Sequence, residues 1–418
     1  MSQKHNESVQ LRTRQNSSPA RPVVNRTKKR VKIDYSDMEV SEYYLDASKR
    51  YRAAKWVSFL LLIAFLAVNL LFFRSNITYS NLMYLLRDLD TGPVSVSTNF
   101  ASITYNEESG ATYDIFKGRL AYASSEGFRL YNSTGARELD ESRYMQNPAV
   151  VSGDKYAIAY DVGGHAYSVF TNMACVLEAT SEDIVENICV ADNGAFAVLT
   201  RSNEAKYLVS VYKENLRLQT KYYKDKFVVD MAMDEKGATL AIASADVSVS
   251  GISGEIMLCK TGTEETETLS VANAMPLAVS YMENGVLLVL CNTKLVLVSN
   301  GKIESEYSFS KGDPMSFYFA DDSVVVLCSN NAVSTDNEVF LFDSQGKLIY
   351  NKEINEKVVS VCCDAGAAYV LCDEKIVRIG TDDTVKTVKC DASVNAIVPL
   401  YGTLLKCEKL GTSTVSFE

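Results

Sequence analysis

The sequence predicts an all-β protein, an eight-bladed β-propeller preceded by a single N-terminal transmembrane helix. Three observations lead to this prediction. An uncharged apolar run occupies residues 56–73, a pattern of strands repeats about every 40 residues from residue 111 onward, and the charge is divided unevenly along the chain. The 418 residues are 47% hydrophobic and 22% charged, an ordinary globular composition that excludes global disorder.

The uneven charge separates the first 55 residues from the rest. Residues 1–55 contain thirteen lysines and arginines and six acids, a net charge of +7, whereas the whole chain has −10. The remainder of the chain therefore has a net charge of −17. Such a division indicates two environments. We predict that residues 1–55 are a largely disordered basic tail in the cytoplasm, without a nucleic-acid partner.

The apolar run at residues 56–73 reads WVSFLLLIAFLAVNLLFF and contains eighteen residues without a charge. As a helix it is about 27 Å long, close to the hydrocarbon thickness of a bilayer. A buried core helix normally has a polar stripe, and a cleaved signal peptide has a shorter apolar core followed by a small-residue cleavage site. We therefore predict one uncleaved membrane span.

Basic residues on the two sides of this run predict its orientation. Four of them lie between Lys49 and Lys55, whereas only Arg74 follows the run closely. The positive-inside rule then places the N-terminus in the cytoplasm and the acidic remainder outside the cell. Leucines at helical spacing predict an amphipathic juxtamembrane helix within residues 74–92, ahead of an extracellular propeller at 93–418.

The repeat consists of an apolar strand, a tight turn, a stronger apolar strand, a third strand that ends near a glycine, and a polar fourth strand. Asn-Gly, Lys-Gly and Ala-Gly pairs at the first turn favour hairpins. The units begin near residues 111, 147, 185, 227, 276, 315, 358 and 394. The last unit has three strands, and residues 98–106 supply its fourth. Seven blades is the alternative if the first or last unit is misread.

This arrangement resembles a family of uncharacterised membrane-anchored propellers from Gram-positive anaerobic bacteria, whose domain is of unknown function. The resemblance rests on the basic tail, the anchor, the leucine-rich helix and the acidic repeats. More distantly, the blades resemble those of the quinoprotein dehydrogenase-like and WD40-like superfamilies. Trp56 is the only tryptophan, so the tryptophan ring of quinoprotein blades is missing. The resemblance therefore implies the fold and no cofactor.

The ten cysteines predict buried packing rather than disulfides or a metal cluster. Four of them lie at one equivalent position, the end of the second strand of a blade: Cys291, Cys328, Cys372 and Cys407. Equivalent positions in neighbouring blades radiate apart, whereas a disulfide requires Cα atoms within about 7 Å. Mostly free thiols on an exported domain fit an anoxic habitat.

Motifs for catalysis are missing from the sequence. The chain has two histidines, and it contains no G-x-S-x-G elbow, Walker loop or G-x-G-x-x-G motif. Acidic spots at Asp192, Asp321-Asp322 and Asp382-Asp383 lack the spaced ligands of a calcium loop. We interpret them as hairpin turns and solvated charge, and we predict no catalytic residue, no cofactor and no metal.

Partner binding is predicted on the loops between the second and third strands, which share one face of a propeller. These loops are longest at residues 201–206, 245–254 and 329–337. The candidate partner-binding residues are Asn203, Glu204, Asp246, Asn330, Asn331 and Asp336.

The leading functional hypothesis is a non-enzymatic, membrane-anchored extracytoplasmic propeller, an interaction or sensing module for an envelope protein or small ligand. The alternative is an enzyme, either a hydrolase or lyase or a quinone-dependent oxidoreductase, with its site in the central funnel. Acids with a raised pKa in the funnel would favour the enzyme, and an apolar plug would count against it. A third hypothesis is a eukaryotic type II protein with a luminal propeller, occupied sequons and disulfides.

Overall fold

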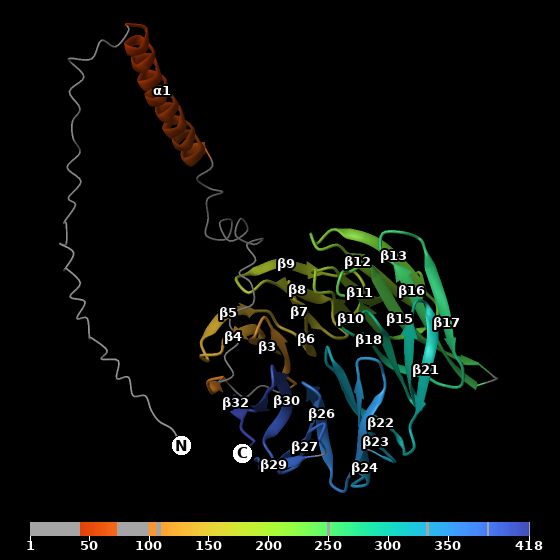
Figure 1. Ribbon diagram of the computed structural model, residues 1–418. Coiled ribbons are helices and arrows are strands. Elements are labelled where there is room, and N and C mark those ends of the chain that lie inside the picture. The colour runs from red at the N-terminus through yellow and green to blue at the C-terminus, as the bar shows by residue number, and fades with distance from the viewer. Residues whose placement is uncertain are drawn as a thin grey trace, which may run out of the picture. The chain divides into compact units, whose positions relative to one another are not determined.

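The computed structural model describes residues 42–72, 100–105, 110–248, 251–331, 334–382 and 384–417 (Figure 1). The chain divides into two compact units, Met1–Ile77 and Thr78–Glu418. Most of the predicted basic tail and the whole of the predicted juxtamembrane helix at 74–92 lie outside the described residues.

Helix α1, Glu42–Phe72, is the regular element of the first unit. Its sequence is rich in alanine, leucine, lysine and arginine and contains no glycine or proline, which favours a continuous helix. The helix begins within the predicted tail and includes the charged residues from Lys49 to Lys55. Among the described residues, no helix is both long enough and apolar enough to cross a membrane. The predicted membrane span at 56–73 is therefore not confirmed.

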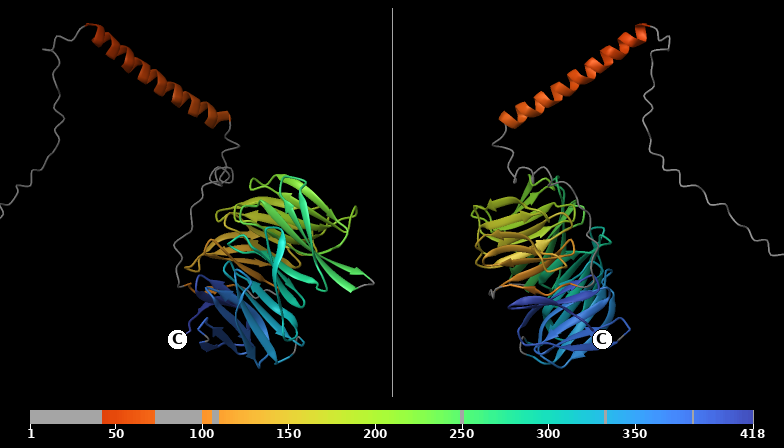
Figure 2. Two further views of the ribbon diagram at one scale, coloured as in Figure 1. Left: turned by 45° about the vertical axis from the view of Figure 1, so that its right-hand side comes forward. Right: turned by 90° about the vertical axis from the view of Figure 1, so that its left-hand side faces the viewer.

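The second unit is a β-propeller of eight four-stranded antiparallel sheets (Figure 2). In blades one to seven the strands pair in sequence order. The strands of the first four blades are β2 (Thr112–Phe116), β3 (Arg119–Ser124), β4 (Gly127–Tyr131), β5 (Arg137–Ser142); β6 (Pro148–Ser152), β7 (Ala157–Asp161), β8 (Ala166–Phe170), β9 (Cys175–Thr180); β10 (Val185–Val190), β11 (Phe196–Arg201), β12 (Tyr207–Tyr212), β13 (Leu218–Lys224); β14 (Phe227–Met233), β15 (Thr239–Ser248), β16 (Gly251–Lys260) and β17 (Thr266–Val271).

The remaining four blades complete the ring. Their strands are β18 (Pro276–Tyr281), β19 (Leu287–Cys291), β20 (Lys294–Ser299), β21 (Lys302–Ser308); β22 (Asp313–Phe319), β23 (Ser323–Ser329), β24 (Asn337–Asp343), β25 (Leu348–Ile354); β26 (Val358–Asp364), β27 (Ala367–Cys372), β28 (Lys375–Ile379), β29 (Val385–Lys389); β30 (Val394–Leu400), β31 (Thr403–Glu408), β32 (Gly411–Val415) and β1 (Ile103–Thr104). The predicted count of eight blades is confirmed, and the alternative of seven is wrong.

Ring closure joins the two ends of the propeller, so the orange first blade lies beside the blue last blade in Figure 1. Most of the first strands contact the first strand of the next blade around the centre, and β2 contacts β30. Strand β1 pairs with β32 through Ile103 and Thr412, which confirms the predicted fourth strand of the last blade. The Tyr105 hydroxyl donates to the carbonyl oxygens of Glu408 and Gly411, 3.0 Å from each.

The hydrophobic core lies between adjacent blades. All five residues of β19 are buried, because a middle strand is covered on both faces by the neighbouring blades. Outer strand β25 alternates between partly buried and exposed residues, as expected for a strand with one solvated face. Leu288 of blade five and Phe340 of blade six, for example, share one cluster. With the core between the blades, the first strands face the centre of the ring.

The ten cysteines are all free in the structure, where the sequence predicted mostly free thiols. The four at the equivalent strand position are fully or almost fully buried. Burial raises the pKa of the Cys291, Cys328 and Cys407 thiols to about 12, so these thiols stay protonated and unreactive. They act as small core residues.

Candidate functional site: an acidic central funnel

The turn between the first and second strand of each blade lies at one mouth of the central channel. In six of the eight blades this turn contains an acid that lines a central cavity. These rim acids are Asp154, Asp192, Glu235, Glu283, Asp321 and Asp364. Lys117 occupies the turn in the first blade and Tyr401 in the eighth. Both have a positive φ and precede a glycine, as in tight hairpin turns.

Hydrogen bonds between neighbouring turns hold the rim together. The Lys155 amide donates to the Asp192 carbonyl at 3.1 Å, linking blades two and three. The Glu283 amide donates to the Asp321 carbonyl at 3.3 Å, linking blades five and six. The Gly402 amide donates to the Asp364 carboxylate, linking blades eight and seven. These bonds fix the carboxylate positions through the backbone, so the rim is preorganised.

Behind the rim are two cavities of about 690 and about 400 Å³. They share six lining residues, and we call their combined space the central funnel. Among the residues that the structure describes, nine carboxylates line it, against a single basic side chain, that of Lys117. The nine are the six rim acids with Asp114, Asp230 and Asp322. An excess of one charge sign in a concave site concentrates counter-ions there.

Asp230, on the first strand of blade four, is the most constrained of these carboxylates. Its Oδ1 accepts from Asn187 Nδ2 at 2.8 Å, and its Oδ2 accepts from the Val279 amide at 2.9 Å. One side chain thus joins the first strands of blades three, four and five. Burial raises the pKa of Asp230 to about 6, and the hydrogen bonds oppose that shift. We interpret Asp230 as a structural carboxylate.

Three other carboxylates of the funnel have a raised pKa. Burial raises the pKa of Asp114 to about 6, although its Oδ1 accepts from the Ile115 amide at 2.8 Å. Partial burial, assisted by the charge of Asp154, raises the pKa of Asp192 to about 6. The pKa of Asp321 is also raised, first by burial and then by the charge of Glu283. The rim acids therefore interact mainly with like charges.

Aromatic rings alternate with the acids along the funnel wall. Phe319 lines both cavities, Tyr281 lines the larger one, and Tyr318 and Tyr401 line the smaller one. Burial raises the pKa of Tyr318 and Tyr401, so both phenols are neutral at physiological pH. Tyr401 is 58% exposed and lies at the rim.

The described residues contain no group of three or more histidines, cysteines or acids arranged to hold a metal ion. The rim acids belong to turns of different blades, and a cation site needs several oxygens around one point.

The residues predicted to bind a partner lie elsewhere. All six are exposed, on loops of blades three, four and six, and none lines the funnel. The predicted loop at 245–254 is largely strand, because β15 continues to Ser248 and β16 begins at Gly251. Asp246 lies in this extended hairpin and forms an ion pair with Lys226 at 4.0 Å.

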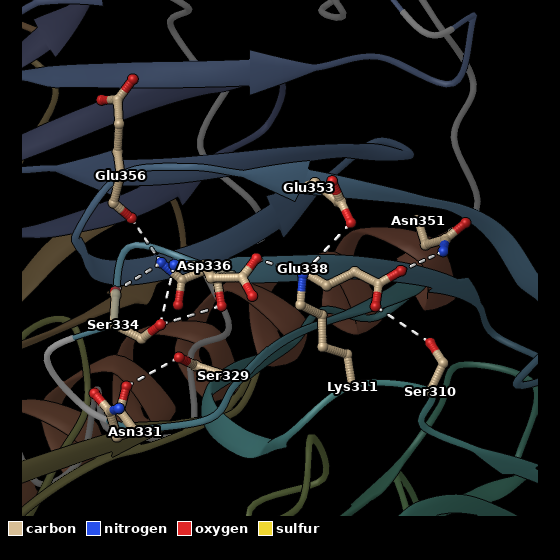
Figure 3. A network of polar contacts seen from close by, with 11 residues as sticks. Ser310, Lys311, Ser329, Asn331, Ser334, Asp336, Glu338, Asn351, Glu353 and Glu356 are labelled. Carbon is tan, nitrogen blue, oxygen red and sulfur yellow. Dashed lines mark hydrogen bonds and ion pairs between the residues drawn. The ribbon is translucent and has the colours of Figure 1, made fainter.

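In blade six the predicted residues belong to a local polar network (Figure 3). Asp336 pairs with Lys311, which also lies 3.4 Å from Glu353. The Asn331 carbonyl accepts from Ser329 Oγ at 2.9 Å. These contacts shape the loop itself, so its polar residues have a structural role.

Three of the funnel acids, Asp192, Asp321 and Asp322, were interpreted from the sequence as turn residues and solvated charge. Asp192 and Asp321 do lie in turns, but these turns converge on one cavity. The signal that sequence reasoning missed was the recurrence of an acid at the same turn of six repeats. A solvated turn does not require an acid rather than asparagine or glycine.

Comparison with known proteins identifies the family. The model of the family of unknown function DUF5711 matches residues 95–410. The chain belongs to the DUF5711 family. The match spans nearly the whole propeller, which agrees with the predicted resemblance to a family of unknown function.

Solved structures share the fold of this DUF5711 protein at low sequence identity. Sqt1 from Saccharomyces cerevisiae is 10% identical, with 76% of this chain and 100% of that chain covered and a TM-score of 0.54. BamB from Moraxella catarrhalis is 12% identical, with 76% and 97% covered and a TM-score of 0.52. These similarities support the propeller fold alone. Comparison with curated proteins gives no match.

Proposed function

We propose that this protein is a non-enzymatic binding module of the cell envelope, whose central funnel receives a small ligand. The observation behind the proposal is the funnel, a concave space of about 690 Å³ in its larger part with nine carboxylates around it. Its volume is within the range of small-molecule sites. Hydrogen bonds between blades hold the rim, where neighbouring carboxylates repel one another, and a ligand that offsets this repulsion would bind favourably.

A ligand screen tests the funnel as the binding site. The full chain in detergent micelles is screened by thermal shift against small molecules, in parallel with the double variant Asp192→Asn/Asp321→Asn. We expect compounds that raise the melting temperature of the wild type and not of the variant, because binding to the folded state stabilises it. If every stabilising compound acts equally on both proteins, the funnel is not the binding site.

The envelope location rests on α1 and the sequence around it. Large apolar side chains of this helix are exposed, among them Trp56 at 65%, Leu61 at 66% and Phe65 at 65%. A lipid bilayer would cover such side chains, and the run at 56–73 has no charge. The basic residues that precede the run favour a cytoplasmic N-terminus and an extracellular propeller.

Cysteine labelling tests this topology. Gln345, exposed in a turn of blade six, is replaced by cysteine, and whole cells are treated with a membrane-impermeant maleimide. We expect labelling of Gln345→Cys in intact cells, and labelling of Ser17→Cys in the tail only after lysis. The parent chain measures the background from the native thiols, most of which are buried. The reverse pattern would contradict the proposed orientation.

An enzyme remains the second candidate, because two funnel carboxylates have a pKa suited to acid–base catalysis. Asp114 and Asp192 line the same cavity, and the pKa of each is raised to about 6. A hydrolase or lyase fits this observation. Turnover of a bound ligand that is lost in Asp192→Asn, with binding retained, would favour the enzyme over the binding module.

A further inference from the structure

We propose that the ligand of the central funnel is a small organic polyamine, held by the rim carboxylates and by the aromatic rings between them. This inference rests on the proposed binding function and names the chemical class of the ligand. Four properties of the funnel support it: its charge, the spacing of its carboxylates, its aromatic lining and its volume.

The charge of the funnel selects cations. Nine carboxylates face a single lysine, and the charges of Asp154, Glu283 and Asp364 all reach Asp321. Mutual repulsion of this kind is relieved by a multivalent cation and worsened by an anion.

The distribution of the rim carboxylates over six blades favours an extended cation over a metal ion. The described residues contain no cluster of three or more groups that would hold a metal. Each rim acid comes from a different blade, and hydrogen bonds hold the turns of blades two and three, five and six, and seven and eight beside one another. A polyamine has ammonium groups separated by methylene chains, so it can meet carboxylates of several blades at once.

The aromatic lining favours an organic cation in particular. Tyr401 stands at the rim in the place of an acid, and Phe319 lies deeper, where both cavities meet. Ring faces attract ammonium groups and also pack against methylene chains. A hydrated inorganic ion makes no use of apolar ring surface, whereas an alkylammonium chain does.

The volume of about 690 Å³ sets the upper size of the ligand. It admits a small molecule and excludes a folded partner. A polyamine of three or four amino groups is therefore the probe that best matches the funnel in size and charge.

Binding of such a ligand should weaken in mild acid. The pKa of Asp192 is about 6, so this carboxylate loses its charge as the pH falls through that value. The charged groups around it are Asp154, Asp321 and Glu235.

Calorimetric titration with spermidine tests the proposal. The full chain in detergent micelles is titrated at about pH 7.5 and at about pH 5. We expect saturable binding at the higher pH, and affinity that falls about tenfold or more in Asp192→Asn/Asp321→Asn. The matched control is Glu204→Gln/Asp246→Asn, which removes the same two charges from exposed loops outside the funnel. The control should bind as the wild type does.

Three outcomes would contradict the proposal that the ligand is a polyamine. These are an equal loss of affinity in both double variants, saturable binding of Ca²⁺ that displaces spermidine, and no spermidine binding at either pH. If the ligand screen still finds an uncharged compound that depends on Asp192 and Asp321, the funnel remains a binding site and only the ligand class is wrong. If no compound depends on these residues, the binding function fails as well.

Discussion

The two faces of the propeller differ in how their polar residues are paired. On the face with the loops between second and third strands, charged residues pair locally, as Asp336 does with Lys311. On the opposite face, the rim acids of six blades surround a cavity, and the main charges around Asp321 are other carboxylates. The first face was singled out in the sequence by its long loops. The second face is distinguished in the structure by carboxylates that repel one another. Carboxylates in a cavity whose pKa is raised by burial and by like charges are candidates for a functional site.

The largest expected change in the free energy of unfolding tests whether the carboxylate of Asp230 has a structural role. Asp230→Ala leaves Asn187 Nδ2 and the Val279 amide without their acceptor, inside the ring. We expect the free energy of unfolding to fall by about 3 kcal/mol, measured by urea denaturation. The control is Asp246→Ala in the exposed hairpin, which should change it by less than about 0.5 kcal/mol. Equal effects of the two substitutions would contradict the structural role of Asp230.

The second effect is the dependence of stability on pH. Asp114, Asp192 and Asp230 have a pKa of about 6 in the folded chain, whereas an aspartate exposed to water has a pKa of about 3.8. Between these values the folded state binds more protons than the unfolded state, so stability falls as the pH rises through this window. We expect a higher urea midpoint at about pH 5 than at about pH 7. An unchanged or lower midpoint at the acidic pH would show that the funnel acids are not destabilising at neutral pH.

A smaller effect of opposite sign is expected at the rim. Asp192→Asn removes a charge that is repelled by Asp154, and its amide keeps a similar size. Because the rim is open to solvent, we expect a gain of at most about 1 kcal/mol at neutral pH, with the same substitution weakening ligand binding. The measurement is urea denaturation at low and high salt, since salt should reduce the gain. A loss of stability would place Asp192 among the structural residues.

The smallest effect is expected on the loop face. Asp336→Asn breaks the ion pair with Lys311, whose ammonium keeps Glu353 as a neighbour at 3.4 Å. Exposed ion pairs contribute about 0–1 kcal/mol, so the unfolding free energy should change little and spermidine affinity not at all. A large loss of affinity in this variant would move the binding site to the loop face.

The repeat in the sequence was sufficient to locate the blades. Predicted unit starts near 185, 227, 276, 358 and 394 coincide with the first residues of β10, β14, β18, β26 and β30. Hairpins are local structures, so alternation of apolar residues and the glycine after a turn determine where each strand begins. The extended hairpin β15–β16 was missed because its tip residues are small and polar and read as a loop.

The sequence by itself therefore determined the family, the blade count, the closing strand and the burial of the cysteines at the end of the second strand, all of which depend on a local pattern and its recurrence along the chain. Only the tertiary structure decided the site. Asp192 and Asp321 are separated by three blades in the chain, and ring closure brings their charges within reach of each other. An acid in a turn looks solvated when its repeat is considered alone. Convergence of six such turns on one cavity makes it part of a funnel.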